Sequence, residues 1–516
     1  MRQATLRPVP PNIPGYGSVT PFTGECQVPA DLVRHGRSMR PLPRFAQKLL
    51  PKLDAAFDAC AIRDGATLSF HHHLRNGDQV LNQVLDVAAR RGLRGLTVAA
   101  SSLFPVHAPL VQHVERGVVA RIVTAYMAGP VAAAVSRGAI RLPVVMQTHG
   151  GRAAAIESGR LPIDVAFIAA PAADDYGNLS GAVGRAACGP LGYARVDAAH
   201  AARVVAVTDH LVPYPCAPID IAQDSVDYVV SVDSIGDPAG ILSGTTRPTR
   251  DPLGLRIADS AAAVIEAAGV LGPDFSFQTG AGGISLAVAE RLAEVMRRRG
   301  VQGSFAAGGV TAMLCEMLEA GLFRHLFDVQ CFDLRAVESF RNDPRHLAMS
   351  ASMYASPLSR GAVVNRLTTM ILGAAEVDLD FNVNVTTGSD GRILGGSGGH
   401  ADTADGAALA IVTTRLTTAS APKIVERVRC ITTPGATVDV IVTEVGVAVN
   451  PRRPELAARL RDAGLPLRSI EDLCAEAARL APPLRPTPDD GRIVAVVEYR
   501  DGSVIDVVRE TAALAQ

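Results

Sequence analysis

The sequence predicts an α/β protein with two similar domains, each a mostly parallel sheet with flanking helices. In both halves of the chain, short apolar segments of strand length alternate with segments long enough for a helix. A chain of 516 residues also exceeds what a single hydrophobic core supports, which favours two domains. The composition, 48% hydrophobic with 34 Pro and 47 Gly, is typical of a globular chain and not of a disordered one.

The first domain is expected over residues 61–245, after an irregular, proline-rich segment over residues 1–60 with one helix near residues 44–60. Residues 67–70 are predicted as a strand, residues 71–78 as a polar connection and residues 79–90 as an amphipathic helix that Asp78 can cap. Further strands are predicted at residues 95–100, 121–126, 142–147, 165–169, 204–208 and 228–232. In a parallel sheet of this kind, ligands bind outside the carboxyl ends of the strands.

The second domain is expected over residues 246–516, because the loop-rich passage of residues 236–252 interrupts the pattern. The same order then restarts with a strand at residues 275–278, a glycine-rich turn at 279–283 and a helix at 284–299. Further strands are predicted at residues 329–332, 377–385, 411–413 and 438–443. Two domains of similar construction place a cleft between them, and we expect residues 71–78, 279–283 and 395–402 to line it.

Charge and cysteine content exclude several classes of function. With 50 basic and 51 acidic residues the net charge is −1, so no overall basic field attracts nucleic acid or an anionic membrane. The eight cysteines are scattered without a CxxC pair, which indicates reduced thiols and argues against a disulfide framework and a zinc site. No apolar run reaches 18 residues and the N-terminus has no apolar signal region, so the prediction is a cytoplasmic protein without a membrane span.

The stretch with the strongest ligand-binding character is residues 395–406, Gly-Gly-Ser-Gly-Gly-His-Ala-Asp-Thr-Ala-Asp-Gly. Its five glycines allow positive φ and leave no Cβ atoms, so consecutive N–H groups can point at one anion or carbonyl oxygen. Asp402 and Asp405 can cap the segment that follows or orient His400. The alternative, which composition alone favours, is an ordinary glycine-rich turn between sheet elements.

A second glycine-rich turn contains Gly280, Gly282 and Gly283 and directly precedes the helix predicted at residues 284–299. Free N–H groups and the helix dipole make such a turn a site for an anion or an oxyanion. It lacks both the GxGxxG spacing of a dinucleotide fold and the lysine of a P-loop. We therefore expect neither a nicotinamide cofactor nor ATP.

Several polar side chains follow predicted strands. His71, His72 and His73 alternate faces, so they cannot all ligate one metal, and we predict a substrate-binding loop. The alternative is one packed and two solvated rings. Arg247 and Arg250 can each pair with a carboxylate, although solvation at the surface is the commoner arrangement. The carboxylate of Glu444 either faces the cleft or caps a loop.

Residues 164–180, 395–406 and 442–447 resemble signatures of the coenzyme A transferase superfamily. Within it, residues 69–78, 243–247 and 277–283 resemble the alpha chains of citrate lyase, and the motifs occur in the same order from residue 13 to near residue 480. The resemblance implies two CoA-transferase-like domains. It also implies a citrate CoA-transferase, which exchanges acetyl for citryl on an acyl carrier protein and releases acetate.

The resemblance further implies partners and site residues. A gamma chain, the acyl carrier protein, would supply a coenzyme A-like pantetheine arm, for which acetyl-CoA is a surrogate, and no cofactor is tightly bound. A beta chain, the citryl-ACP lyase, would cleave the citryl thioester to oxaloacetate. Residues implied to bind citrate are His71, His72, His73, Arg75, Arg247 and His400. Those implied to bind pantetheine are Gly395, Gly396, Ser397, Gly398, Gly399 and Asp402. Those implied in catalysis are Gly280, Gly282, Gly283 and Glu444.

One departure from related enzymes bears on the mechanism. Related acetate transferases and acyl-CoA hydrolases carry a nucleophilic glutamate where this chain has residues 303–309, Gly-Ser-Phe-Ala-Ala-Gly-Gly, without a carboxylate. The resemblance therefore implies direct attack of a citrate carboxylate on the acetyl thioester, through a mixed anhydride. Three alternatives stay open: a glutamate-dependent CoA-transferase or hydrolase that uses Glu444, a non-catalytic sensing or scaffold subunit, and a sugar-phosphate isomerase.

Overall fold

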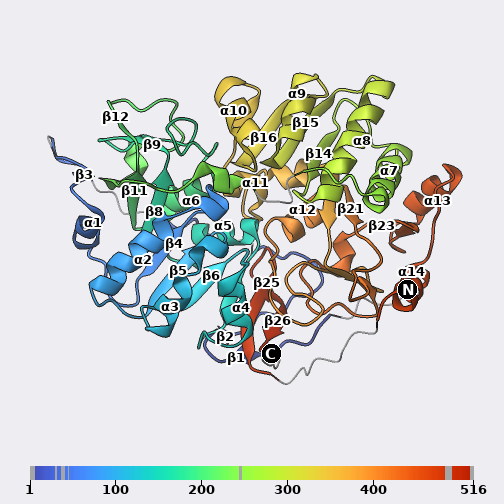
Figure 1. Ribbon diagram of the computed structural model, residues 1–516, viewed down its shortest axis with the longest axis horizontal. Helices are drawn as coiled ribbons and strands as arrows, with labels where there is room; N and C mark the ends of the chain where they lie inside the picture. Colours follow the sequence, from blue (N-terminus) through green and yellow to red (C-terminus); the bar gives the residue numbers. More distant parts are fainter. Residues whose placement is uncertain are drawn as a thin grey trace.

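Two large sheets organise the computed structural model, which describes residues 6–29, 32–36, 41–44, 46–242, 247–482 and 491–511 (Figure 1). Within these ranges the first sheet has ten strands, in the order β26 (Val504–Arg509), β25 (Ile493–Glu498), β7 (Val144–Met146), β6 (Val119–Thr124), β5 (Leu96–Ala100), β4 (Thr67–Phe70), β8 (Val165–Ala170), β11 (Arg203–Thr208), β13 (Tyr228–Ser231) and β3 (Leu49–Leu50). The second has eight, in the order β17 (His346–Ala348), β16 (Phe323–Cys331), β15 (Gly303–Val310), β14 (Ser276–Thr279), β18 (Thr369–Gly373), β21 (Leu409–Thr413), β23 (Val440–Thr443) and β24 (Gly446–Val449). Each sheet is parallel except for one edge strand, which confirms the predicted fold class.

The two sheets share one topology. In the first, the chain adds β5, β6 and β7 on one side of β4 and then β8, β11 and β13 on the other. In the second, β15, β16 and β17 lie on one side of β14, and β18, β21 and β23 on the other. The order of growth therefore reverses at β4/β8 and at β14/β18, and ligands of open α/β sheets bind at such switch points.

A small three-stranded sheet also follows each switch point. The first contains β10 (Leu179–Ser180), β9 (Ala172–Asp174) and β12 (Leu211–Val212). The second contains β20 (Val383–Asn384), β19 (Glu376–Asp378) and β22 (Ile424–Val425). In both, the aspartate that ends the middle strand accepts a hydrogen bond from an asparagine four residues later, Asn178 or Asn382. The repetition extends to these small sheets, so the two halves are of similar construction around their switch points.

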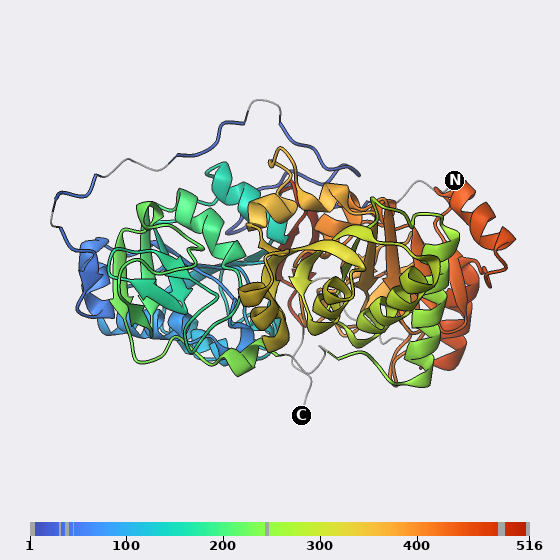
Figure 2. The ribbon, with the colours of Figure 1, turned by 90° about the horizontal axis from the view of Figure 1, so that it is seen from above.

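The two ends of the chain connect the halves. The C-terminal hairpin β25–β26 extends the first sheet beside β7, although it follows the whole second sheet in the sequence. Residues 6–29 lie along β26, where the Phe22 N–H donates to Val504 O at 2.9 Å and Arg7 pairs with Asp506 at 2.7 Å (Figure 2). The boundary expected at residues 245/246 lies outside the described residues, so the division into residues 1–60, 61–245 and 246–516 stays a prediction.

Most helices and strands form where the sequence predicts them. An exception arises where a side chain bonds to backbone N–H groups and turns the chain. The helix expected after residue 78 is α2 (Val80–Arg90), and Asp78 Oδ1 accepts from its first N–H at 3.3 Å, as predicted. The single strand expected at residues 377–385 is instead the hairpin β19–β20. Asp378 accepts from the N–H groups of Asp380 and Asn382, and Phe381 between them adopts a φ of 65°. Near residues 44–60 only α1 (Leu53–Ala59) is helical in the described part, after the edge strand β3.

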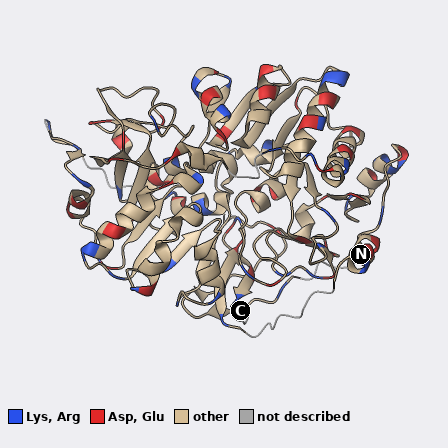
Figure 3. Ribbon diagram, in the orientation of Figure 1, with Lys and Arg blue, Asp and Glu red and all other residues tan. Residues whose placement is uncertain are grey.

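Helices cover both sheets and carry mixed charge (Figure 3). No helix within the described ranges combines the length and apolar character that crossing a bilayer requires. The remaining helices are α3 (Leu110–Glu115), α4 (Pro130–Ser136), α5 (His149–Glu157), α6 (Gly192–His200), α7 (Pro252–Ala267), α8 (Gly283–Arg299), α9 (Ala312–Glu319), α10 (Leu334–Asn342), α11 (Ala351–Ala355), α12 (His400–Gly406), α13 (Pro454–Asp462) and α14 (Ile470–Leu480).

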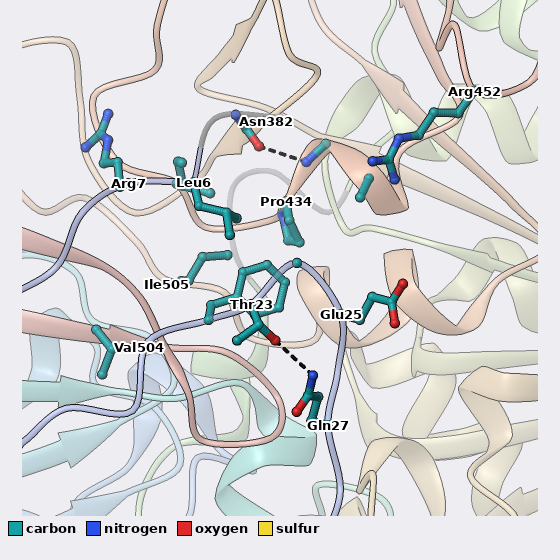
Figure 4. Close-up of a pocket in the computed structure, with 15 residues that line it drawn as sticks. Leu6, Arg7, Thr23, Glu25, Gln27, Asn382, Pro434, Arg452, Val504 and Ile505 are labelled. Carbon is teal, nitrogen blue, oxygen red and sulfur yellow. Dashed lines mark hydrogen bonds between the residues drawn. The ribbon is translucent and has the colours of Figure 1, made fainter. Parts of the chain in front are cut away.

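A pocket of about 280 Å³ lies where the N-terminal segment crosses the second half (Figure 4). Its walls come from that segment, from the second half and from β26, namely Leu6, Arg7, Phe22, Thr23, Gly24, Glu25, Gln27, Asn382, Ile431, Pro434, Gly435, Ala436, Arg452, Val504 and Ile505. None of the predicted site residues lines it. The pocket is therefore separate from the switch points.

Candidate functional site

The histidine loop follows β4 at the first switch point, and its first ring is an anchor inside the protein. His71 Nε2 lies 3.0 Å from Asp197 Oδ2, and Arg152 donates two hydrogen bonds to the same carboxylate, at 2.8 and 3.0 Å. All three side chains are buried. Burial alone would raise the pKa of Asp197, but Arg152 and His71 outweigh it and hold this pKa well below its usual range. His71 therefore anchors the histidine loop to the buried pair of Arg152 and Asp197.

Replacing Asp197 with asparagine should leave Arg152 as a buried, incompletely paired cation and destabilise the protein by about 3–5 kcal/mol. The Asp197 pKa is depressed on folding, so its stabilising contribution is present above the unfolded value, about 3.9, and is lost as the pH falls through the folded value. Urea midpoints measured at neutral and acidic pH test this. Glu290→Gln breaks the exposed pair with Arg250 and should cost under about 1 kcal/mol. Equal losses in both variants would contradict the prediction.

The other rings of the loop join a buried aromatic cluster. The His72 ring lies 4.6 Å from Tyr193 on α6 and 5.6 Å from His149 at the start of α5, measured between centroids. Both ring nitrogens of His73, and Nδ1 of His149, are buried without a hydrogen-bond partner among the described residues. Burial lowers the pKa of His73, and burial together with Arg152 lowers the pKa of His149 to about 3. These imidazoles are neutral and hold unused polar atoms.

Arg75, at the end of the same loop, is a cation without a counter-charge. Its guanidinium lies 4.6 Å from the ring centre of Phe332 and 5.5 Å from that of Phe104. Nη1 is buried without a partner, and no described carboxylate forms an ion pair with it. The backbone of Arg75 adopts a φ of 52°, which is unfavourable for a residue with a side chain. Unpaired charge and backbone strain together are typical of a ligand-binding residue.

The second half contributes side chains from the ends of three neighbouring strands. Gln278 on β14 donates through Nε2 to Tyr354 Oη at 2.7 Å, and Gln330 on β16 donates to His72 O at 2.5 Å. The carbonyl oxygen of each amide is buried and unpartnered within the described chain, as is the hydroxyl of Thr311, directly after β15. Gln330 therefore connects the second sheet directly to the histidine loop of the first.

The loop of residues 395–399 lies against the first half at this junction, where α5, α11 and α12 gather (Figure 1). The Gly398 N–H donates to Ala125 O at 3.0 Å, and the His149 N–H donates to Gly398 O at 2.8 Å. A Cβ atom on Gly396 would lie 2.5 Å from Ala125 O, and one on Gly399 would overlap Tyr354 Oη. The N–H groups of Gly396, Ser397 and Gly399 have no partner among the described residues. Glycine thus permits close packing and leaves donors unused.

The two polar residues that follow have their hydrogen bonds inside the protein. Asp402 is buried, accepting from Thr148 Oγ1 at 2.8 Å and from the Gly150 N–H at 2.9 Å. The ring nitrogens of His400 lie 2.7 Å from Thr433 Oγ1 and 2.8 Å from Gly373 O. Both side chains fix the start of α12 in place.

Of the remaining predicted residues, Gly280, Gly282, Gly283 and Arg247 lie around the second switch point, and Glu444 does not. The Gly280 N–H donates to Ile371 O at 3.0 Å, whereas those of Gly282 and Gly283 at the start of α8 have no partner in the described chain. Arg247 is exposed, and its carbonyl oxygen lies 3.1 Å from the position of a Cβ on Gly283. Glu444 accepts from the Leu416 N–H at 3.1 Å, after a strand that β18 and β21 separate from β14. The structure therefore does not bring Glu444 to the histidine loop.

The structure thus brings residues 71–75, Gln278 and residues 395–402 to one junction between the sheets, and the turn of residues 279–283 follows Gln278 in the chain. It adds residues that sequence reasoning missed, namely His149, Tyr193, Thr311, Gln278 and Gln330. Gln278 and Gln330 lie at the ends of their strands, Thr311 follows β15 directly and His149 comes shortly after β7. Because ligands gather at the carboxyl ends of parallel strands, the polar residues nearest each predicted strand end would have been the signal for most of them.

The matches to known proteins span all the residues of this junction. The family model described as "Citrate lyase, alpha subunit (CitF)" matches residues 46–511. The citrate lyase alpha chain of Escherichia coli (strain K12) is 49% identical over 464 residues, which are 90% of this chain and 91% of that protein. A crystal structure from Streptococcus mutans, described as an alpha subunit of citrate lyase in complex with citrate, is 45% identical with a TM-score of 0.95 and covers 98% of this chain and 99% of that one.

A more distant structure shares the fold alone. The alpha subunit of a malonate decarboxylase from Acinetobacter baumannii is 16% identical, with a TM-score of 0.62 over 83% of this chain and 92% of that one. Both sheets and their switch points therefore belong to an architecture wider than the close relatives.

Proposed function

Because the chain belongs to the citrate lyase alpha subunit family, we propose that it transfers the thiol of an acyl carrier from an acetyl group to citrate. The reaction converts acetyl-carrier and citrate to citryl-carrier and acetate. The partners are a carrier (gamma) chain, whose pantetheine arm enters as a substrate, and a lyase (beta) chain that cleaves the citryl thioester. The protein acts in the cytoplasm under this proposal.

The observation that supports this proposal is the set of unpartnered polar atoms at the junction. Arg75 offers an unpaired guanidinium, and His73 and His149 offer ring nitrogens that can donate. Citrate brings about three negative charges near neutral pH, and a polycarboxylate needs donors from several directions. We assign these three side chains to the carboxylates of citrate and the carbonyl oxygen of either Gln278 or Gln330 to its hydroxyl, which donates one hydrogen bond. His71, His72 and His400 hold this set in place through their own hydrogen bonds, and Arg247 lies beside Gly283.

Stabilisation of the oxyanion is assigned to backbone N–H groups. Those of Gly396, Ser397 and Gly399 are unused in the described chain, and so are those of Gly282 and Gly283 at the start of α8. Such donors are worth on the order of 10² to 10³ in rate when they point at developing negative charge. The Gly280 N–H belongs to the sheet ladder, so its role is to hold the turn.

The proposed chemistry has two acyl transfers and no covalent enzyme intermediate. A citrate carboxylate attacks the acetyl carbonyl and expels the carrier thiolate, which forms a mixed citryl–acetyl anhydride. The thiolate then attacks the citryl carbonyl and releases acetate. Residues 303–309 form most of β15 and hold no carboxylate, and the neighbouring Asp328 is buried and accepts hydrogen bonds from His346 and Gln330. No nucleophilic carboxylate therefore supports a glutamyl thioester at this position.

Initial-rate kinetics with acetyl-carrier and citrate test the proposal. Both substrates must be bound together, so we expect intersecting double-reciprocal plots, no adduct trapped by borohydride and retained exchange in Glu444→Ala. Parallel plots with a borohydride-sensitive adduct that disappears in Glu444→Ala would instead establish the glutamate-dependent alternative. Absence of any exchange in the complete wild-type complex would favour a non-catalytic subunit.

A further inference from the structure

A buried arginine of the C-terminal hairpin reaches across to the second half. Arg500 lies in the turn between β25 and β26 and is 3% exposed. Its Nη1 lies 2.5 Å from Asp405 Oδ2, its Nη2 donates to Ala355 O at 3.1 Å and its Nε lies 3.6 Å from Asp402 Oδ1. The hairpin belongs to the first sheet, whereas Asp402 and Asp405 lie on α12. A buried ionic contact therefore connects the last strands to the helix that follows the glycine loop.

The Asp402 carboxylate continues this connection to the junction. It accepts from Thr148 Oγ1 at 2.8 Å and from the Gly150 N–H at 2.9 Å, the residues on either side of His149. The His149 N–H in turn donates to Gly398 O. One carboxylate therefore binds the residues on both sides of His149, and the His149 N–H binds the glycine loop.

We propose that Arg500 is a positioning residue for the transfer reaction, which holds Asp402 so that His149 and residues 396–399 keep their relative positions. The inference rests on the proposed function of the junction. Arg500 itself is enclosed behind α12 and acts through Asp402.

Asp402 is faced by few charged groups. Besides Arg500 there is Asp405 on its own helix, and in the described part of the chain the groups that interact with Asp402 from other elements are Cys26 of the N-terminal segment, Tyr193 of α6 and Tyr354 of α11, while His149, between two of its donors, has a pKa lowered to about 3 by burial and Arg152. Burial raises the pKa of the cysteine and of both tyrosines, so they are neutral near pH 7 and Arg500 supplies the positive charge. The effect of each charge on Asp402 can therefore be tested separately.

The pH dependence of the rate distinguishes a positioning role of Arg500 from a purely structural one. Burial raises the pKa of Asp402 to about 6, Arg500 opposes the rise and Asp405 adds to it. A protonated carboxyl carries a hydrogen on one oxygen, accepts more weakly and has no charge to pair with Arg500, so the rate should fall as the pH drops through this value. Loss of Arg500 should move the acidic limb to higher pH, and loss of the Asp405 charge should move it to lower pH.

The experiment compares Arg500→Met, Arg500→Lys and Asp405→Asn in the complete complex, measuring kcat and the KM for citrate from about pH 5 to 9, with the thermal midpoint of each variant. We expect Arg500→Met to lower kcat at least about tenfold with the KM for citrate within about twofold, since the effect falls on alignment and not on citrate affinity. Arg500→Lys should restore part of the rate. Asp405→Asn loses the outer ion pair, but should keep kcat within about twofold.

Equal losses of rate and thermal midpoint in Arg500→Met and Asp405→Asn, with the acidic limb unmoved in both, would show that Arg500 only holds the halves together and would overturn the inference. A shift of the acidic limb to higher pH in Arg500→Met and to lower pH in Asp405→Asn would support the inference, even if Arg500→Met also melts at a lower temperature. If the wild-type complex does not exchange acetyl for citryl on the carrier, the proposed function on which the inference rests is wrong.

Discussion

Replacing Arg75 with methionine is expected to lower kcat/KM for citrate by about 10² to 10³-fold, since a buried, charge-assisted interaction with a carboxylate is lost. Methionine keeps the apolar contacts with Phe104 and Phe332, so the loss reports the charge. Most of the effect should fall on KM, because the guanidinium contacts a carboxylate that is bound in both ground state and transition state. The measurement is the citrate dependence of the exchange rate at saturating acetyl-carrier.

Arg75→Gly separates function from stability. Glycine relieves a positive φ that costs a residue with a side chain roughly 1–2 kcal/mol, which offsets part of the lost packing. We expect this variant to unfold near the wild-type midpoint and still to bind citrate poorly. Arg250→Met, which breaks the exposed pair with Glu290, is the control and should leave the kinetics unchanged. Citrate affinity within a factor of two of wild type in both Arg75 variants would exclude this residue from the site.

Gly398→Val should abolish exchange at the limit of detection while most of the fold survives. Gly398 adopts a φ of 51°, which a β-branched residue rarely adopts, and a Cβ there would lie 3.4 Å from His149 Nε2. The loop would move away from Ala125 and the unused N–H groups at Gly396, Ser397 and Gly399 would lose their alignment. Exchange assays and the far-ultraviolet circular dichroism spectrum measure the two effects separately.

Gly300→Val is the matched control for the backbone strain that valine introduces at a positive φ in Gly398→Val. Gly300 ends α8 with a φ of 63°, and a Cβ there meets nothing within 4 Å. It carries a similar backbone penalty of roughly 1–2 kcal/mol away from the junction. We expect it to lower the unfolding midpoint modestly and to keep the exchange rate. If both valine variants transfer at the wild-type rate, the glycine loop has no part in catalysis.

Local sequence determined the elements and the family. Alternating apolar segments predicted most of the parallel strands, because a buried parallel strand must be apolar on both faces. The motifs at residues 69–78, 277–283 and 395–406 carried the resemblance to citrate lyase alpha chains, which the family model confirms. These motifs are also the loops at the switch points, where glycine and polar residues are required next to the strand ends.

The tertiary structure alone decided which of those residues share a site. Asp402 is a buried acceptor between α12 and α5, Glu444 lies on a different strand end and His149 enters the junction through contacts with Gly398 that are 249 residues away in the chain. The return of the C-terminal hairpin to the first sheet, which places Arg500 against Asp402, had no local signal. Secondary structure follows from neighbouring residues, whereas the partner of a buried charge or an unused N–H depends on which distant segments pack against it.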